Sequence, residues 1–372
     1  MTADQKDQSL QFEGMAKIRV IAFYLPQFYP IPENDEWWGK GFTEWTNVGK
    51  AGPLFRGHYQ PRVPADLGYY DLRLPEVREA QAQMAGEHGI EGFCYWHYWF
   101  GDGRRLLERT FNEVLATGKP DFPFCLGWAN HSWKAKTWIP GGDDRVLMEQ
   151  RYPGEADYIE HFNTVLPAFK DRRYIRVDDK PLFIIWNPED MPDASAFMRL
   201  WNDLAVKSGL KGIYFVAYCV LKGNISRFLG MGFEAVTLDL IVEPFRSVNF
   251  LHRVLFWARR TFLGIPKHVR YGRYSRHVLK NTDLSDKVYP CILPNFDHSP
   301  RSGKRGLVLT DSTPDNFGKL LESLLIRFKS VTTSNKIIFI KSWNECGEGK
   351  YLEPDLKYGK RYLGKNTESP GN

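Results

Sequence analysis

Eight short runs rich in β-branched and aromatic residues alternate with longer segments of helical periodicity, and this alternation constrains the fold most strongly. Such alternation is typical of parallel βαβ units. The expected strands span residues 18–24, 89–95, 122–128, 181–186, 212–218, 234–240, 289–293 and 336–341. The expected helices span 74–87, 104–116, 155–169, 194–207, 251–261 and 314–329, with only a weak helix between the fifth and sixth strands. Eight strands favour an α/β fold of the closed (β/α)8 TIM barrel type over an open sheet.

The length of 372 residues suits one such barrel with long βα loops. We expect a flexible N-terminal segment at 1–17, a single barrel domain at 18–364 and a disordered tail at 365–372. The connection at 25–73 is too long for a simple loop and holds several Trp residues. Since long ordered loops are usually functional, we interpret it as one wall of a cleft.

Positive charge is concentrated in one part of the chain. The net charge is +6, yet residues 245–280 contain nine Lys or Arg and no acid, so the remainder is slightly acidic. This distribution argues against a nucleic-acid-binding protein. Residues 248–263 mix Phe, Leu and Trp with Arg, which suits a helix lying on an anionic membrane or contacting an acidic glycan. The alternative is a barrel helix with a solvated basic face.

Five scattered cysteines form no CxxC motif, which favours reduced thiols inside the cell. The first residues are polar, without the apolar core of a secretory signal. No run approaches the ~18 apolar residues of a membrane span. The sequence therefore predicts a cytoplasmic protein, with contact at the inner membrane as the further possibility.

Aromatic, amide, carboxylate and imidazole side chains gather just beyond the expected strands and in the long loop. In a barrel of this type, residues after the strands form the active site. Flat rings stack on the C–H faces of sugars, while amides and acids bind hydroxyl groups. The candidate carbohydrate-binding residues are Tyr24, Gln27, Trp45, Tyr95, His97, Trp128, Asn130, His131, Tyr218, Asp239, Asn295, Asp297, Trp343 and Asn344.

Two glutamates, Glu345 and Glu348, follow the last expected strand. In a helical turn this spacing places Cβ atoms roughly 5–6 Å apart. Retaining glycosidases hold their two carboxyl groups about 5–5.5 Å apart. Such close carboxylates are expected to separate in pKa, so that one keeps a proton while the other is ionised. We therefore predict that this pair is catalytic; a solvated structural pair is the alternative.

Several stretches resemble the WbsX-like proteins of bacterial surface-polysaccharide gene clusters, a family related to glycoside hydrolase family 99. They are AFYLPQF at 22–28, WWGKGFTEWTN at 37–47, HYQP at 58–61, GFCYWHYWF at 92–100 and NECGEG at 344–349. The resemblance spans about residues 18–355. It implies a TIM barrel and a metal-free, retaining mechanism of the endo-α-mannosidase type.

The resemblance also implies roles for the two glutamates. Glu345 corresponds to the general base that acts on the sugar 2-hydroxyl, which then attacks the anomeric carbon. Glu348 corresponds to the acid that protonates the leaving oxygen and later activates water. If the substrate lacks an axial 2-hydroxyl, Glu345 is expected to act as a plain nucleophile.

The chain departs from the family pattern in two places. Cys346 and Gly347 replace the usual Trp-Ala between the glutamates, and His131 replaces a glutamate after the third strand. Both glutamates of the pair match the family pattern, so we expect the two departures to change which sugar is bound and not the chemistry.

Three alternatives stay open. A glycosyltransferase or transglycosylase acting in O-antigen or capsule synthesis fits the usual WbsX name, although no Asp-x-Asp motif is present. Metal-dependent hydrolysis is disfavoured because the nine histidines form no His-x-His or His-x-x-x-His pattern. We accordingly predict no metal and no cofactor. The third alternative is a non-catalytic glycan-binding protein.

Overall fold

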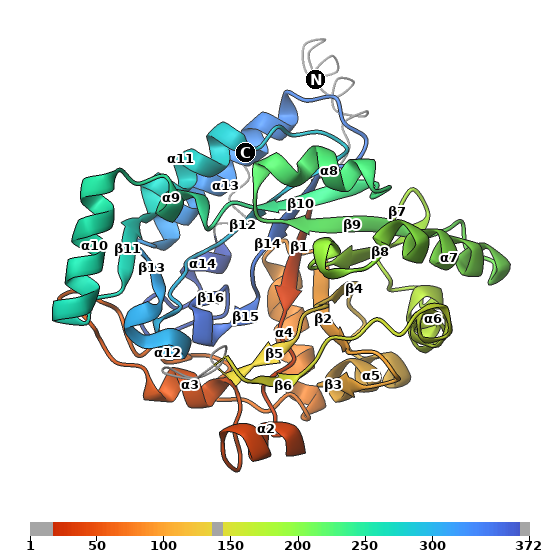
Figure 1. Cartoon of the computed structure of the whole chain (residues 1–372), viewed down its shortest axis with the longest axis horizontal. Coiled ribbons are helices and arrows are strands. Elements are labelled where there is room, and N and C mark those ends of the chain that lie inside the picture. The colour runs from red at the N-terminus through yellow and green to blue at the C-terminus, as the bar shows by residue number, and fades with distance from the viewer. Residues whose placement is uncertain (1–17, 136–143, 365–372) are drawn as a thin grey trace, which may run out of the picture.

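Eight parallel strands form a closed barrel in the computed structural model, which describes residues 18–135 and 144–364 (Figure 1). They are β1 (Arg19–Tyr24), β2 (Gly92–Trp99), β4 (Phe124–Trp128), β8 (Lys180–Ile185), β9 (Tyr214–Cys219), β10 (Ala235–Asp239), β12 (Val288–Ile292) and β14 (Ile337–Ile340). Neighbours in the chain are neighbours in the sheet, and β1 pairs with both β2 and β14, which closes the barrel. The predicted TIM barrel is confirmed. The predicted flexible ends, 1–17 and 365–372, lie outside the described residues.

Helices connect successive strands on the outside of the barrel (Figure 1). They are α4 (Pro75–Glu87), α5 (Arg109–Thr117), α6 (Glu155–Lys170), α7 (Ala194–Lys207), α8 (Ile225–Gly230), α11 (Tyr271–Asn281) and α13 (Pro314–Lys329). Local sequence explains several ends: Thr313 accepts the backbone N–H of Asn316 and caps α13. The helix predicted at 104–116 begins only at Arg109, because β3 (Arg105–Leu106) pairs antiparallel with the end of β2.

The basic segment folds into more than the single helix that its sequence predicts. The predicted helix at 251–261 is present as α10 (Phe250–Leu263), but α11 occupies the barrel layer beside α13. Between them, β11 (Lys267–Arg270) pairs with β13 (Leu307–Thr310). None of the residues of α10 is buried, and the helix lies at the periphery of the molecule (Figure 1). Helix α10 is therefore an addition outside the barrel layer.

Aromatic side chains fill the barrel interior. The ring of Phe23 stacks on Trp96 at 4.6 Å between centroids and lies 5.6 Å from Phe339. Side chains at alternate strand positions face the helices instead, as Tyr95 does against Phe111 of α5. The barrel is thus a packed core, and space for a ligand is left only towards its mouth.

Short elements build the mouth at the carboxyl ends of the strands. The long loop after β1 contributes α2 (Pro32–Trp38) and α3 (Glu44–Lys50), and the last strand leads into β15 (Asn344–Glu345), η5 (Cys346–Glu348) and β16 (Lys350–Tyr351). Helix α3 packs on η5 and on α12 (Ser299–Ser302). The other small elements are β5 (Trp133–Lys134), β6 (Val146–Met148), β7 (Arg176–Val177), η2 (Pro188–Asp190), η3 (Lys222–Asn224), α9 (Glu243–Arg246), η4 (Gly303–Arg305) and α14 (Arg361–Gly364). Within residues 18–135 and 144–364, no helix has the length and apolarity needed to cross a bilayer.

Candidate active site

A cavity of about 250 Å³ opens at the barrel mouth, where several strands end. Its walls combine three aromatic side chains, two carboxylates and two cations. The lining residues are Leu25, Trp96, Tyr98, Ala129, His131, Trp186, Arg301, Lys341, Glu345 and Glu348. The predicted pair of glutamates therefore faces the same cavity as two indole rings.

The two glutamates are held by one lysine. Strand β16 folds back antiparallel on β15, which places Lys350 opposite Glu345. The Lys350 ammonium lies 3.0 Å from Glu345 Oε2 and also contacts Glu348 Oε2. Two hydrogen-bond lengths limit the separation of these oxygens to roughly 6 Å. The geometry is that of a close carboxylate pair rather than a widely spaced one.

The Glu345 carboxylate is held by two contacts and is almost fully buried. Its Oε1 accepts a hydrogen bond from Trp96 Nε1 at 2.9 Å, while Lys350 contacts Oε2. Burial raises the pKa of the Glu345 carboxyl, but the charges of Lys350 and Lys341 outweigh burial, so the pKa lies below its ordinary value. Glu345 is therefore an oriented carboxylate before any ligand arrives.

Glu348 belongs to a buried ion-pair chain that reaches the long loop. Arg301 contacts Glu348 through one amino group and lies 2.6 Å from Glu44 Oε1 through the other. The backbone N–H of Gly347 also donates to Glu44 at 2.8 Å. Burial opposes ionisation of Glu348, yet Lys350 and Arg301 hold its pKa well below the ordinary value. Ion pairs thus join the long loop after β1, the turn between β15 and β16, and α12 at the cavity wall.

The pKa values do not separate in the way that the sequence predicts. Both glutamates have lowered pKa values, because Lys350, Lys341 and Arg301 supply positive charge that the E-x-x-E pattern does not reveal. Glu44, with one cationic partner and complete burial, has a raised pKa instead. The surrounding cations therefore favour the ionised form of both members of the pair.

A third cation, Lys341, projects into the cavity from the end of the last barrel strand. Its ammonium lies 4.0 Å from the centroid of the Trp186 ring and 3.1 Å from the hydroxyl of Tyr218. That hydroxyl donates to Asp239, and the Tyr218 ring stacks under Trp186 at 4.1 Å. Tyr218 and Asp239 are therefore placed beneath the cavity wall, where they orient Lys341.

The family model described as glycosyltransferase WbsX matches residues 20–365. The chain belongs to the WbsX family. It is 35% identical over 353 residues to the uncharacterized protein WxcX of Xanthomonas campestris pv. campestris, with 92% of this chain covered. That match covers 48% of WxcX, so the chain spans about half the length of the curated relatives it matches.

Solved structures share the architecture of this WbsX chain. A glycoside hydrolase-like protein superposes with a TM-score of 0.59 at 16% identity, covering 96% of this chain and 95% of that chain. The GH99 endo-alpha-mannosidase from Bacteroides thetaiotaomicron gives a TM-score of 0.53 at 14% identity, with coverages of 95% and 96%. At these identities the likeness establishes the fold, and the predicted relation to WbsX is confirmed by the family match.

Of the predicted binding residues, His131 also reaches the cavity of this WbsX chain. Burial, together with the charge of Lys341, lowers the pKa of its imidazole to about 4. A neutral ring at pH 7 can donate and accept hydrogen bonds. Its position suits a contact with a sugar hydroxyl.

Four predicted binding residues point away from the cavity. Tyr24 donates to Gln81 of α4, and Tyr95 packs against α5. His97 contacts His161 of α6, and the Trp128 ring lies 5.5 Å from Phe197 of α7. Strand alternation instead turns Trp96 and Tyr98 inwards. The interpretation of these four as sugar contacts is therefore replaced by a packing role between barrel and helices.

The remaining predicted residues support the mouth from behind. The side-chain amide of Asn344 accepts a hydrogen bond from the backbone N–H of Leu25 and donates one to its carbonyl. The side-chain amide of Asn130 forms the same two hydrogen bonds with the backbone of Asn187. Trp45 Nε1 donates to the carbonyl of Tyr70. The backbone carbonyl of buried Gln27 accepts from Glu44, and Trp343 packs against Phe93. These residues position the loops and do not line the cavity.

Asn295 and Asp297 anchor the HYQP stretch of the long loop. Asp297 Oδ2 accepts hydrogen bonds from His58 and Gln60, each at 2.7 Å, while Asn295 accepts from Arg62 at 2.6 Å. Despite burial, the His58 and Arg62 contacts lower the pKa of Asp297 to about 2. The N–H of Asp297 also donates to the Glu348 carbonyl at 2.8 Å. Asp297 thus couples the loop to the turn that carries Glu348.

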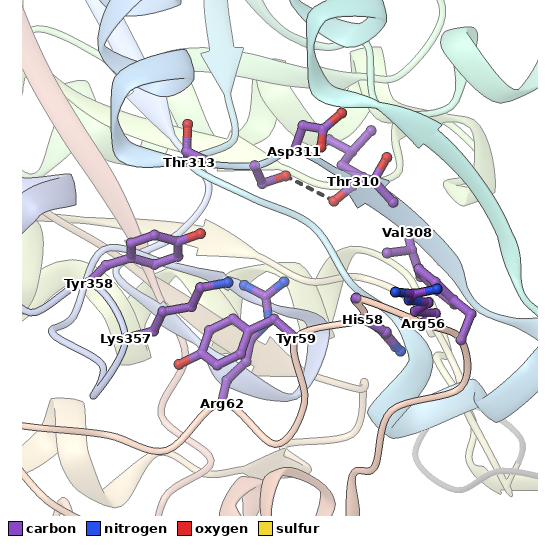
Figure 2. A pocket seen from close by; sticks show the side chains of 14 residues that line it. Arg56, His58, Tyr59, Arg62, Val308, Thr310, Asp311, Thr313, Lys357 and Tyr358 are labelled. Carbon is purple, nitrogen blue, oxygen red and sulfur yellow. Dashed lines mark hydrogen bonds between the residues drawn. The ribbon is translucent and has the colours of Figure 1, made fainter.

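A second cavity, of about 400 Å³, lies beyond this anchor (Figure 2). Figure 2 shows the Arg62 guanidinium and the Lys357 ammonium pointing towards one another beside Tyr59 and Tyr358. The Lys357 ammonium lies 4.4 Å from the Tyr59 ring centroid. Asp311 is the one acid on the described walls, so this cavity lacks a carboxylate pair and is not assigned the chemistry.

Sequence reasoning did not select Arg301, Lys341, Lys350 and Glu44. Lys341 ends a predicted strand, and Glu44 lies within the WWGKGFTEWTN stretch, so both carried a positional signal. No feature of the sequence pointed to Arg301, because its partner Glu44 lies 257 residues away. In the described part of the chain, no three His, Cys, Asp or Glu side chains are grouped to hold a metal ion. Metal independence stays a prediction.

Proposed function

We propose that this WbsX chain is a retaining, metal-independent glycoside hydrolase that cleaves within a glycan. The observation that carries the proposal is the single ammonium of Lys350 bridging Glu345 and Glu348 at the wall of an indole-lined cavity. A separation of roughly 6 Å or less suits retention, since an inverting pair needs space for a water between the carboxyls.

Glu345 is proposed as the base or nucleophile. Trp96 and Lys350 hold its carboxylate in one orientation and keep it ionised. It takes the proton of the sugar 2-hydroxyl as that oxygen attacks the anomeric carbon. On a sugar without an axial 2-hydroxyl, the Glu345 oxygen itself attacks.

Glu348 is proposed as the acid that protonates the leaving oxygen and then removes a proton from the incoming water. Because Lys350 and Arg301 lower its pKa, it must gain a proton as the substrate enters. A glycan that excludes water and displaces the Lys350 ammonium would raise the pKa towards the value that an acid requires.

The proposed substrate is an oligosaccharide or polysaccharide, as a bacterial surface polysaccharide or its lipid-linked precursor. The WbsX family match and the rings of Trp96, Tyr98 and Trp186 support a glycan ligand. A cytoplasmic location, suggested by the free thiols, stays a prediction.

A second candidate is transfer of a glycan from a phosphate-activated donor. It is favoured by Lys341 and Arg301 in the cavity wall, because these cations could hold the phosphate of the donor. The family description also names a glycosyltransferase.

A screen of bacterial glycans with the wild-type chain and the Glu345→Gln and Glu348→Gln variants tests the proposal. The expected result is a product with retained anomeric configuration by NMR, formed by the wild type alone. Turnover that requires a nucleotide or polyprenyl phosphate donor would support transfer instead. Binding without turnover in all three proteins would indicate a glycan-binding protein.

A further inference from the structure

Helix α10 exposes an unusual amount of apolar surface for a helix of a folded protein. Five side chains form what we call the apolar stripe, with exposed fractions between 44% and 76%: Phe250, Leu251, Val254, Trp257 and Phe262. The large side chains of a surface helix normally face the core. The fold uses Phe256, which packs against the core, but none of the five side chains of the apolar stripe belongs to the core.

The apolar stripe occupies one side of the helix, and that side faces away from the protein. At 3.6 residues per turn its members fall within an arc of roughly 140°. Phe256 and Arg259, which are less exposed, lie on the opposite side, and the Phe256 ring is 5.6 Å from the Lys267 ammonium of β11. The helix is therefore amphipathic, with its apolar side turned outwards.

Beneath α10 lies a groove of about 410 Å³ rich in positive charge. We call it the arginine groove after four of its lining residues: Arg259, Arg270, Arg273 and Arg276. Its other walls are Val248, Leu255, Phe256, Val269, His252 and His268. A groove with apolar walls and guanidinium groups fits a ligand that has both an apolar part and an anion.

The charges of the arginine groove are poorly compensated within the protein. Arg273 donates to the backbone carbonyl of Ser247, and Arg270 lies 3.6 Å from the exposed Asp311 carboxylate. Within residues 18–135 and 144–364, neither Arg259 nor Arg276 forms an ion pair. Residues 245–280 themselves contain no acid. The groove therefore has positive charge available for an anion from outside the described chain.

We propose that α10 docks the protein on an anionic phospholipid bilayer. The apolar stripe would enter the boundary between headgroups and acyl chains, where Phe, Leu and Trp are favoured. The arginine groove would receive lipid phosphates, which guanidinium groups bind in a bidentate manner. The two sides of α10 thus offer the two signals, apolar burial and positive charge, that stable peripheral binding needs.

The position of α10 in the chain gives this docking a consequence. The helix lies in the connection from β10 to α11, and such βα connections are at the same barrel end as the cavity. Docking would hold the cavity end of the barrel close to glycans attached to lipids. This consequence rests on the proposed function, whereas the docking itself does not.

Co-flotation of the full chain with vesicles tests the docking independently of activity. We expect binding to vesicles of phosphatidylglycerol and phosphatidylcholine at low salt, little binding to phosphatidylcholine alone, and weaker binding as salt screens the arginines. The triple variant Phe250→Gln, Trp257→Gln, Phe262→Gln should reduce the partition coefficient at least about 100-fold. Gln is a good helix former, so α10 should persist.

Matched controls use equally exposed side chains elsewhere. Val206→Gln, Ile326→Gln and Leu356→Gln remove exposed apolar side chains away from α10 and should leave flotation unchanged. Arg259→Glu with Arg276→Glu should abolish the preference for anionic lipid, whereas Arg199→Glu with Lys207→Glu on α7 should not. Absence of flotation at low salt would overturn the proposal. So would a dimer that dissociates in the triple variant without any vesicle binding, since the stripe would then be a protein interface.

Discussion

Lys350 of the hairpin at 344–351, together with Arg301, and the arginines of the segment at 245–280 differ in whether acidic side chains accompany them. In the hairpin region, Lys350 and Arg301 each contact one buried carboxylate and the partly buried carboxylate of Glu348. In the segment, arginines line an open groove without acidic residues of their own. The first arrangement is complete before a ligand binds, which suits catalysis by preorganised groups. The second is incomplete, which suits recruitment of an external anion.

The largest expected effect concerns the completed arrangement. Glu348→Gln keeps the shape of the side chain but removes the proton that a leaving oxygen needs, so turnover should fall at least about 1000-fold. Initial rates on the identified glycan check this expectation. The exposed Glu322→Gln on α13 is the control and should turn over normally. Full activity of Glu348→Gln would remove the pair from the reaction.

The free energy of unfolding should depend on the buried, ion-paired Arg301 far more than on Arg276 of the arginine groove. Arg301→Met removes the cation that pairs with buried Glu44 and partly buried Glu348, which should cost about 3–5 kcal/mol of unfolding free energy. Arg276→Met in the arginine groove should change it by no more than about 0.5 kcal/mol. Urea denaturation followed by circular dichroism measures both. Equal losses would show that the groove is also part of the folded network.

Glu353 follows the same hairpin and is a buried carboxyl group of a different kind. In the described part of the chain, it forms no ion pair with a Lys or Arg side chain. It accepts hydrogen bonds from Gln81 and the Tyr70 hydroxyl, and burial raises its pKa to about 8. Between its unfolded pKa of about 4.3 and 8, the native protein holds a proton that the unfolded chain releases. This group therefore makes stability fall as pH rises through that window.

Glu353→Gln should remove that fall. The loss of unfolding free energy between pH 5 and pH 8 should be smaller in the variant than in the wild type by roughly 2–4 kcal/mol. Urea midpoints at the two pH values test this. Glu345 and Glu348, whose pKa values are lowered, have the opposite sign: their stabilisation is present above about pH 4.3 and is lost as pH falls further. An unchanged pH dependence in the variant would contradict the assignment.

The smallest effect is expected on α10. Phe262→Ala removes a ring that is 74% exposed, so the unfolding free energy should change by less than about 0.5 kcal/mol. Phe328→Ala, which removes a fully buried ring from α13, should cost about 3–5 kcal/mol. Thermal or urea unfolding compares them. A large loss at Phe262 would mean that the apolar stripe supports the fold rather than a partner.

The strand pattern predicted the barrel because each buried strand is a short apolar run bounded by turns. It did not predict which side chains face inwards. Residues 92–99 of β2 are buried on both sides, so the run shows no alternation of polar and apolar residues. The sequence predicts Tyr95 and His97 as binding residues, whereas Trp96 and Tyr98 line the cavity. A shift of one residue along a strand exchanges the inward-facing and helix-facing sides.

The sequence by itself determined the eight-stranded barrel, the glutamate pair beyond the last strand and the amphipathic, acid-free segment, because periodicity, spacing and composition are local properties. Tertiary structure alone brought Arg301 to the pair, since Arg301 reaches Glu348 across 47 residues and Glu44 across 257 residues. It also decided that the apolar side of α10 points outwards. Both outcomes depend on which surfaces pack together, and the chain order does not specify that.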